Sequence, residues 1–581
     1  MNLMRSVWIF VFLMLGWASS LHAAERPNIL IIFTDDQGYA DLACYGNKKN
    51  KTPVLDRLAK EGTRFTSFYA QSVCGPSRSA LLTGRYPFRS KGWSMPASEI
   101  TFGELMQKAG YQTACIGKWD VSNRKAILPR MPNAQGFDYY FGTLGANDGG
   151  GVAFHENNKR AGNTRDMGSL TRLYTDKAID FLEHKRDAKK PFVLYVAHTM
   201  MHTIIDASEK FRGKSKGGLY GDVVEEFDFE TGRLLAALDK LKLADNTLVI
   251  YTSDNGPWNQ PAYINRKKGH PKGAIFWGEA GALRDGKGSC YEAGYRVPCI
   301  VRWPGKVPAG RVSDAIFSTL DFMPTFAKLA GFKVPADRVI DGVDQTDLLL
   351  GKSEKGNRET FVFRNNGIRK GKWKYLKAKH NVYGYARDTT RKEVEELYDL
   401  EADLGETENL AAQHPKIVAE LKALMEKITE GKAGGGTKIG LEIPKFQLDY
   451  KNKGPHGGLR QIKATTANGS VVFDVTDKFG IGGGSIRLVA GQWPETVLIR
   501  LHLAGLEGFS VSVGNKKLLR RDLNVRMLDA KGKPLEGRYL RKPTGPNSSK
   551  RTVGYFEAQL PRAKLLVADQ FDLSWVDFYR R

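Results

Sequence analysis

The fold is decided near the N-terminus by Pro27-Asn28-Ile29-Leu30-Ile31-Ile32-Phe33, an apolar run that stops at Thr34-Asp35-Asp36-Gln37-Gly38. A continuous apolar run of this length, bounded by polar turn residues, is typical of a strand buried on both faces of a sheet. The two carboxylates Asp35 and Asp36 therefore follow the carboxyl end of a buried strand. Ligands of open α/β sheets bind beyond that end of the strands.

Helix-like and strand-like segments alternate after this run. The sequence predicts helices over 53–61, 102–109, 173–183 and 222–240, and strands over 111–116, 191–197 and 247–252. This alternation predicts an α/β domain over residues 25–358, with a mostly parallel sheet covered by helices on both faces. We expect one rim of that sheet to gather the polar groups at the strand ends, which are Asp35, Asp36, Lys118, His198, His202, Asp254 and Asn255.

The pattern changes beyond residue 358. Short β segments over 361–364, 373–376 and 397–400, with a helix over 415–430, predict a small antiparallel α+β subdomain that ends with a Gly-rich linker at residue 437.

Residues 438–581 form the last predicted domain. Alternating runs such as 471–475 and 497–503 predict an all-β module, whose aromatic residues we interpret as core in preference to a sugar-stacking surface. This module carries 25 Lys and Arg against 13 Asp and Glu, about half of the formal net charge of +25. The large positive charge indicates a polyanionic glycan or an acidic cell surface as partner in preference to nucleic acid, and a solvated basic surface is the alternative.

Residues 1–24 resemble a targeting segment. Arg5 precedes an apolar centre at 7–17, and small residues lie near Ala23 and Ala24, which predicts a cleaved signal peptide. An uncleaved anchor is the alternative, although the apolar centre is short for a bilayer. We therefore expect export to the periplasm or the extracellular space, with no integral membrane segment after cleavage. Of the five cysteines, Cys290 and Cys299 either pair or remain free thiols.

The segment Cys74-Gly75-Pro76-Ser77-Arg78 carries the strongest local signal. Pro76 suits the first position of a helix over 77–83, which would place residue 74 just before the helix N-terminus. Unpaired backbone N–H groups favour an oxyanion there, and Arg78 adds a positive charge. The alternative is a buried structural cysteine.

Two further pairs offer hard oxygen ligands. Asp35-Asp36 and Asp254-Asn255 suit Ca²⁺ or Mg²⁺, and no His or Cys cluster has the spacing of a zinc site. Each pair alone is also common in turns.

Together these segments resemble the type I, formylglycine-dependent sulfatases of the alkaline phosphatase-like superfamily, such as secreted bacterial polysaccharide and aryl sulfatases. The resemblance covers residues 27 to about 430 and rests on Cys-x-Pro-Ser-Arg at 74–78, Gly-Lys-Trp at 117–119 and the segment around Lys287. It implies that a maturation enzyme oxidises Cys74 to Cα-formylglycine, whose hydrate attacks sulfur. It also implies one divalent ion, Ca²⁺ in preference to Mg²⁺, with the ligands Asp35, Asp36, Cys74, Asp254 and Asn255.

The same resemblance implies roles for the remaining polar residues. Arg78, Lys118 and Lys287 would form a cationic clamp, and His202 would protonate the leaving alcohol. Asp120 departs from the pattern, because the family has a histidine after Gly-Lys-Trp. Either Asp120 replaces that base, or another group such as His155 or His270 enters the site, or turnover is impaired.

The predicted function is hydrolysis of a sulfate ester, with a sulfated carbohydrate as substrate. One alternative is a phosphoester or phosphonate hydrolase of the same superfamily. The other is a catalytically impaired protein that binds sulfated glycans.

Overall fold

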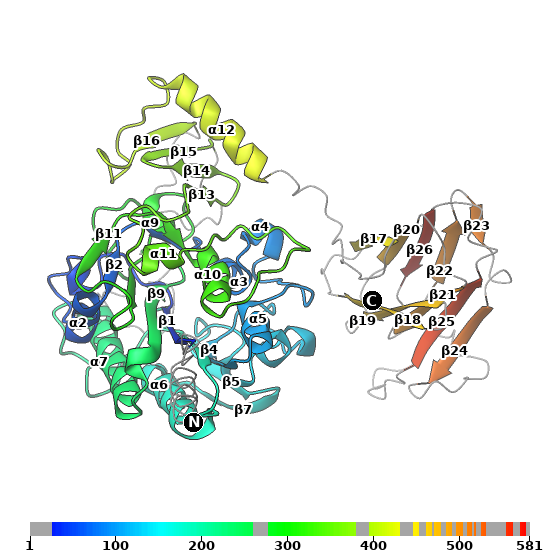
Figure 1. Cartoon of the computed structure of the whole chain (residues 1–581), viewed down its shortest axis with the longest axis horizontal. Helices are drawn as coiled ribbons and strands as arrows, with labels where there is room; N and C mark the ends of the chain where they lie inside the picture. The colour runs from blue at the N-terminus through cyan, green and yellow to red at the C-terminus, as the bar shows by residue number, and fades with distance from the viewer. Residues whose placement is uncertain are drawn as a thin grey trace, which may run out of the picture. The chain divides into compact units, whose positions relative to one another are not determined.

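The computed structural model describes residues 26–259, 277–378 and 394–429, together with the backbone of ten strands between Phe446 and Val576. The predicted signal peptide and the Gly-rich linker lie outside the described residues. The chain divides into two compact units, Met1–Glu430 and Gly431–Arg581 (Figure 1). No helix in the described ranges is both long enough and apolar enough to cross a membrane.

The first unit is built on a ten-stranded sheet with the order β11-β2-β10-β9-β1-β8-β4-β5-β6-β7. The predicted strand near the N-terminus is β1 (Asn28–Thr34), and it pairs in parallel with β8 (Phe192–Ala197) and β9 (Thr247–Ser253). β4 (Gln112–Lys118) and β5 (Tyr139–Thr143) extend the parallel part. Antiparallel pairs of β10 (Cys299–Arg302) with β9 and of β6 (Val152–Glu156) with β5 make the sheet mixed.

Both faces of this sheet are buried, as predicted. Ile29, Ile31 and Phe33 face a core that also contains residues of α3 (Cys74–Thr83), α5 (Phe102–Lys108) and α10 (Phe322–Leu329). Leu30 and Ile32 face the opposite core, with α2 (Pro53–Glu61), α6 (Leu170–Asp180) and α7 (Gly218–Lys240). Figure 1 shows the two sets of helices on either side of β1 and β9. Successive residues of a strand point to opposite faces, so an apolar run without alternation is what two cores require.

A separate four-stranded antiparallel sheet follows within the first unit. It has the order β13-β14-β15-β16, and its strands span Thr360–Phe363, Gly367–Lys370, Trp373–Leu376 and Glu396–Asp399. Leu421 and Met425 of α12 (Pro415–Thr429) are buried in the core that this sheet shares. The predicted α+β subdomain is therefore confirmed, with β14 as a strand that the sequence analysis omitted.

The remaining elements of the first unit are short. They are β2 (Thr63–Phe65), β3 (Phe68–Tyr69), α4 (Pro87–Ser90), β7 (Lys159–Thr164), α9 (Glu292–Tyr295), β11 (Arg311–Ser313), β12 (Phe317–Ser318) and α11 (Thr346–Leu349), with short turns of other helix types such as Ala43–Tyr45.

Ten strands are described in the second unit. One sheet contains β17 (Phe446–Asn452), β20 (Gly484–Ala490), β26 (Gln570–Val576), β22 (Gly508–Val513) and β23 (Lys516–Leu518). The other contains β18 (Arg460–Ala467), β19 (Ser470–Asp477), β21 (Thr496–His502), β25 (Gly554–Pro561) and β24 (Asn524–Asp529).

Two local expectations need correction, and one open alternative is decided. α3 begins at Cys74, so residue 74 is the first helical residue and Pro76 is the third. A proline is tolerated there because the first turn of a helix has no intrahelical partner for its N–H groups. The sequence predicts no strand over residues 142–163, but these residues contain β6 and most of β7. Of the two alternatives for Cys290 and Cys299, the structure has free thiols, since all five cysteines are free.

Candidate active site

The segment that carries Cys74 is held tightly at the start of α3. Cys74 itself is 3% exposed. The Ser77 hydroxyl accepts a hydrogen bond from the Gln71 backbone N–H at 2.8 Å and donates one to the Asp254 carbonyl. Gly75 lies against the indole of Trp93, and a Cβ at this position would approach Trp93 Cδ1 to 2.1 Å. The helix start is thus fixed against the β9 turn and Trp93, and a larger residue at position 75 would require Trp93 to move.

Four buried side chains converge beside Cys74. One donor atom from each of Asp35, Asp36, Cys74 and His202 lies within 4.8 Å of the others. Cys74 Sγ lies 3.3 Å from Asp35 Oδ1 and 3.9 Å from Asp36 Oδ1. Asp36 adopts a left-handed conformation (φ 55°), which turns the chain at the end of β1 and presents both carboxylates to the same point.

Asp254 and Asn255 reach this point from the end of β9. Asp254 Oδ1 accepts a hydrogen bond from the Asp36 backbone N–H at 3.2 Å. The Asn255 amide nitrogen donates to Asp36 Oδ1 at 2.7 Å and to the Gly256 carbonyl at 2.9 Å, which fixes the orientation of the amide. Its oxygen Oδ1 is buried and has no hydrogen-bond partner among the described residues. An unpaired buried acceptor beside three carboxylates fits a divalent cation that takes oxygen ligands.

Three buried cations surround the carboxylates. Lys118 Nζ lies 2.5 Å from Asp35 Oδ2, and Lys287 Nζ lies 2.6 Å from Asp36 Oδ1 and 3.4 Å from Cys74 Sγ. Arg78 Nη2 donates to Asp35 at 3.0 Å and to Asp254 at 2.8 Å. Arg78 is completely buried and also donates to the Lys118 carbonyl at 3.0 Å. These contacts make Arg78 an organiser of the carboxylates, whereas a clamp on substrate was expected.

The electrostatic environment shifts the pKa values of Asp35 and Asp254 in opposite directions. Burial opposes ionisation of Asp35, but Lys118 and the other cations outweigh it and hold its pKa well below the usual range. Burial and the charge of Asp35 raise the pKa of Asp254 to about 7. Burial, together with the charges of Asp254 and Asp35, raises the pKa of the Cys74 thiol well above its usual value. An unmodified Cys74 would therefore remain a protonated, poorly nucleophilic thiol.

His202 is oriented by its own backbone neighbour. Its Nδ1 donates to the Thr203 carbonyl at 2.6 Å, so Nε2 faces Asp36 Oδ2 at 3.8 Å. Burial and the charge of Lys287 hold its pKa well below the usual value. His198 lies apart from the cluster between the rings of Tyr174 and Phe227, where burial lowers its pKa to about 3. His198 is thus a neutral residue of the core, although it follows the end of a strand.

Asp120 is a buried neighbour of Lys118. Its Oδ2 is 3.7 Å from Lys118 Nζ and accepts a hydrogen bond from Trp93 Nε1 at 3.1 Å. Its Oδ1 accepts from Arg124 Nε at 3.0 Å. The carboxylate that replaces the family histidine is therefore compensated by two cations.

Of the two alternative histidines, the one in the described residues contributes no contact to this site. His155 lies on β6, in register with Gly142, and none of its described contacts reaches the cluster. His270 lies outside the described residues.

Two family profiles match the chain. The profile of the Sulfatase family matches residues 27–332, and that of the N-sulphoglucosamine sulphohydrolase C-terminal region matches residues 279–431. The chain belongs to the sulfatase family. Human steryl-sulfatase is 34% identical over 444 residues, which cover 61% of this chain and 74% of that protein. The N-acetylgalactosamine-6-O-sulfatase of Bacteroides thetaiotaomicron is 32% identical over 493 residues, which cover 70% of this chain and 93% of that protein.

Solved structures give the same result for the fold. A Bacteroides thetaiotaomicron protein from work on the metabolism of multiple glycosaminoglycans superimposes with a TM-score of 0.61 and 30% identity. The match covers 70% of this chain and 99% of that chain. The first unit of this sulfatase therefore has the predicted fold, and the protein is an enzyme of the predicted class.

Three residues of the sulfatase site were missed by the sequence analysis. Trp93 and Arg124 hold Asp120, and Asn147 donates to the carbonyls of His202 and Ile204 at 2.7 and 2.8 Å. Arg124 follows Asp120 by four residues, a spacing that is a weak signal for an ion pair. The other two contacts join distant segments, and no local pattern indicates them.

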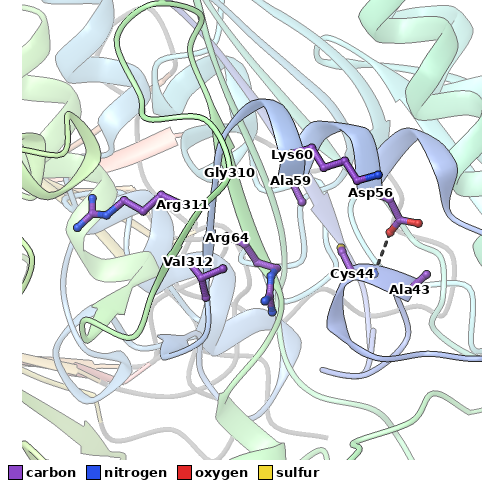
Figure 2. Close-up of a pocket in the computed structure, with 9 residues that line it drawn as sticks. All are labelled: Ala43, Cys44, Asp56, Ala59, Lys60, Arg64, Gly310, Arg311 and Val312. Atoms are coloured by element: carbon purple, nitrogen blue, oxygen red, sulfur yellow. Dashed lines mark hydrogen bonds between the residues drawn. The ribbon is translucent and has the colours of Figure 1, made fainter.

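The sulfatase also has a pocket of about 360 Å³ away from this site (Figure 2). Its walls include Cys44, Asp56, Lys60 and Arg64. Figure 2 shows the hydrogen bond that the Cys44 backbone N–H donates to the Asp56 carboxylate. Burial and the charge of Asp56 raise the pKa of Cys44 to about 12, so this thiol is no second nucleophile. No residue of the Cys74 cluster lines this pocket.

Proposed function

We propose that this sulfatase hydrolyses a sulfate ester of a sulfated carbohydrate. The observation that carries the proposal is the convergence of Asp35, Asp36, Lys118 and Lys287 on Cys74, inside a Cys-x-Pro-Ser-Arg segment at the start of α3. The names of the relatives support a sugar substrate, since one acts on N-acetylgalactosamine 6-sulfate groups.

Two groups would complete this site. Formylglycine made from Cys74 would supply a nucleophilic hydroxyl, and a divalent ion held by Asp35, Asp36, Asp254, Asn255 and residue 74 would neutralise charge on the sulfate oxygens. We favour Ca²⁺ over Mg²⁺ because the proposed ligands are all protein groups, whereas Mg²⁺ usually retains several waters.

The charges of the chain itself favour a sulfate ester. Asp35, Asp36 and Asp254 are matched by Arg78, Lys118 and Lys287, so the buried groups are balanced before a cation is added. Burial opposes protonation of the two lysines, but Asp35 and Asp36 outweigh it and raise both pKa values. Lys118 and Lys287 therefore stay charged, and both lie where they can bind sulfate oxygens as its ester enters beside residue 74.

His202 and Asp120 are the two proton carriers of the proposal. His202 keeps Nε2 toward the cluster, because Nδ1 donates to Thr203. The neutral ring has no proton on Nε2, so in this proposal Nε2 takes a proton from solvent when the anionic ester binds and then gives it to the leaving sugar oxygen. Asp120 is assigned to accept the proton when the enzyme is regenerated. Its ion pairs with Arg124 and Lys118 reduce the repulsion that a bare carboxylate would exert on an anionic substrate.

The proposal includes the predicted biogenesis and organisation of the chain. We propose that residues 1–24 direct export, that a formylglycine-generating enzyme modifies Cys74, and that residues 25–358 and 359–437 form the sulfatase part. The basic region 438–581 would then bring the enzyme to polyanionic glycans.

Mass spectrometry tests the nucleophile directly. The peptide that contains Cys74 should carry an aldehyde after coexpression with a maturation enzyme, whereas the buried Cys115 in the same digest should stay a thiol. The matured protein should release sulfate from members of a panel of sulfated sugars and from an aryl sulfate. An unmodified thiol at Cys74 in fully active protein would refute the mechanism, and inactivity on every sugar with activity on aryl sulfate would refute the substrate class.

A further inference from the structure

One ion pair at the edge of the catalytic cluster joins the Asp120 segment to the loop before β6. Arg124 Nη1 lies 3.4 Å from Asp148 Oδ1 and 3.5 Å from Oδ2, while Arg124 Nε binds Asp120 at 3.0 Å. The side chains of Arg124 and Asp148 are 42% and 33% exposed, in contrast to the completely buried Asp120. The Arg124–Asp148 pair is therefore anchored to the buried Asp120 and is itself accessible to solvent.

The backbone that carries Arg124 is strained. Asp120, Asn123 and Arg124 all adopt the left-handed region, with φ of 52°, 54° and 58°. This region is unfavourable for residues other than glycine, least so for Asp and Asn, and such conformations gather at functional sites. The effect here is to bend the chain back so that Arg124 returns to Asp120.

The partner loop is tied to the proposed proton donor. Asn147, which precedes Asp148, is completely buried and donates to the backbone carbonyls of His202 and Ile204. Asp148 therefore has a fixed position relative to His202, and Arg124 has a fixed position relative to Lys118 through Asp120. The two exposed groups lie next to the residues that would hold the sulfate and the leaving oxygen.

We propose that Arg124 and Asp148 form the subsite that binds the hydroxyl groups of the sugar ring next to the scissile sulfate. This inference rests on the proposed function and extends it. The guanidinium is a fixed donor, the carboxylate is an acceptor, and together they match a pair of neighbouring hydroxyls, each of which both donates and accepts. Nη2 of Arg124 makes no hydrogen bond to a described residue, so the donor side retains capacity for a ligand.

A neutral hydroxyl pair fits this subsite better than a second sulfate does. Arg124 is already paired with Asp120 and Asp148, so the three groups together carry one negative charge. Lys118, the other cation that contacts Asp120, is buried and paired with Asp35. The subsite would thus bind the hydroxyl groups of the sugar ring by hydrogen bonds, whereas the buried lysines would bind the sulfate.

Two substitutions with a matched control test this subsite. Asp148→Asn and Arg124→Gln should each lower the ratio of kcat/KM on N-acetylgalactosamine 6-sulfate, or on the best sugar of a sulfated hexosamine panel, to kcat/KM on 4-nitrocatechol sulfate. We expect a fall in this ratio of about tenfold or more, the effect of losing hydrogen bonds to a charged group. Arg172→Gln, in the exposed Arg172–Asp176 pair, should leave the ratio within about twofold, as exposed pairs contribute little.

Calorimetry separates the subsite from the chemistry. In the Cys74→Ala background, the same sulfated sugar should bind at least about tenfold more weakly after Asp148→Asn, in line with the lost hydrogen bonds. Equal losses on sugar and aryl sulfate, or unchanged sugar affinity, would overturn the subsite while leaving the sulfatase proposal intact. A matured wild-type enzyme that cleaves neither ester would overturn the proposed function and this inference with it.

Discussion

Arg78 Nη2 lies 2.8 Å from Asp254 Oδ2, and neither side chain has any exposed surface. The same nitrogen lies 3.0 Å from Asp35 Oδ2, so one guanidinium joins the ends of β1 and β9. A guanidinium suits this position because its planar donors bind two carboxylates at once. The arrangement of the carboxylates thus depends on an arginine whose side chain has no exposed surface.

Replacing this arginine should be costly for folding. We expect Arg78→Met to lower the free energy of unfolding by about 3–5 kcal/mol, because it leaves two buried carboxylates with less compensation. Urea denaturation monitored by tryptophan fluorescence measures this loss. Arg172→Met is the control, since Arg172 is 70% exposed, and its cost should stay below about 0.5 kcal/mol. A comparably small cost for Arg78→Met would contradict the organising role.

Metal removal should affect stability as well as activity. Chelation should abolish sulfate release, and Ca²⁺ should restore it better than Mg²⁺ does. Ca²⁺ at 100 times its dissociation constant should stabilise the fold by about 2.7 kcal/mol, which a thermal shift detects without turnover.

Asn255 provides the matched test of this metal site. Asn255→Ala removes the unpaired buried oxygen and should reduce the Ca²⁺-dependent thermal shift, whereas Asn163→Ala, at an exposed position, should not. The proposed ligand set is wrong if Asn255→Ala keeps the full shift.

The substitution of Asp120 tests the departure from the family pattern. Asp120→Asn keeps the size of the side chain but cannot accept a proton, so kcat should fall by about 10²–10⁴-fold with a smaller change in KM. Asp120→His should retain more activity than Asp120→Asn does, because it restores a titratable base. Steady-state kinetics on an aryl sulfate gives both values, with Asp166→Asn as the exposed control. Near wild-type kcat for Asp120→Asn would show that another group accepts the proton.

The strands and their polar ends were predictable because the physics that fixes them is local. The helix over 53–61 and the strand over 373–376 coincide with α2 and β15, and β1 differs by one residue at each end. A parallel sheet then brings Asp35 and Asp254 together without any further signal, since adjacent strands end at the same edge. The identity of Lys287 as a site residue, in contrast, depended on the family segment around it.

What the sequence could not supply are contacts between separate loops. Trp93 lies on no predicted element, yet it packs on Gly75 and donates to Asp120. Arg78 was expected to face substrate, because a motif gives the spacing of a residue along a helix but not the neighbours that bury it. The left-handed turn at Asn123 and Arg124 likewise has no glycine to mark it.

A buried ion network between the catalytic domain and the small sheet gives the fold a pH dependence. Lys374 Nζ lies 2.9 Å from Glu292 Oε1 and 2.7 Å from Glu406 Oε1, and all three side chains are completely buried. Burial and the charge of Glu292 raise the pKa of Glu406 from 4.5 to about 7. The folded protein therefore keeps a proton on Glu406 in a pH range where the unfolded chain has lost it.

The sign of the effect follows from this difference. Stability from Glu406 is fully present below pH 4.5 and is lost as the pH rises through about 7, a loss of at most about 3 kcal/mol. Glu406→Gln removes that loss. As the pH rises from 5 to 8, the free energy of unfolding of the variant should therefore increase relative to that of the wild type. Denaturation curves at the two pH values measure it. Glu408→Gln, at an exposed position of the same loop, should show no such shift, and an equal shift in both variants would exclude Glu406 as the source.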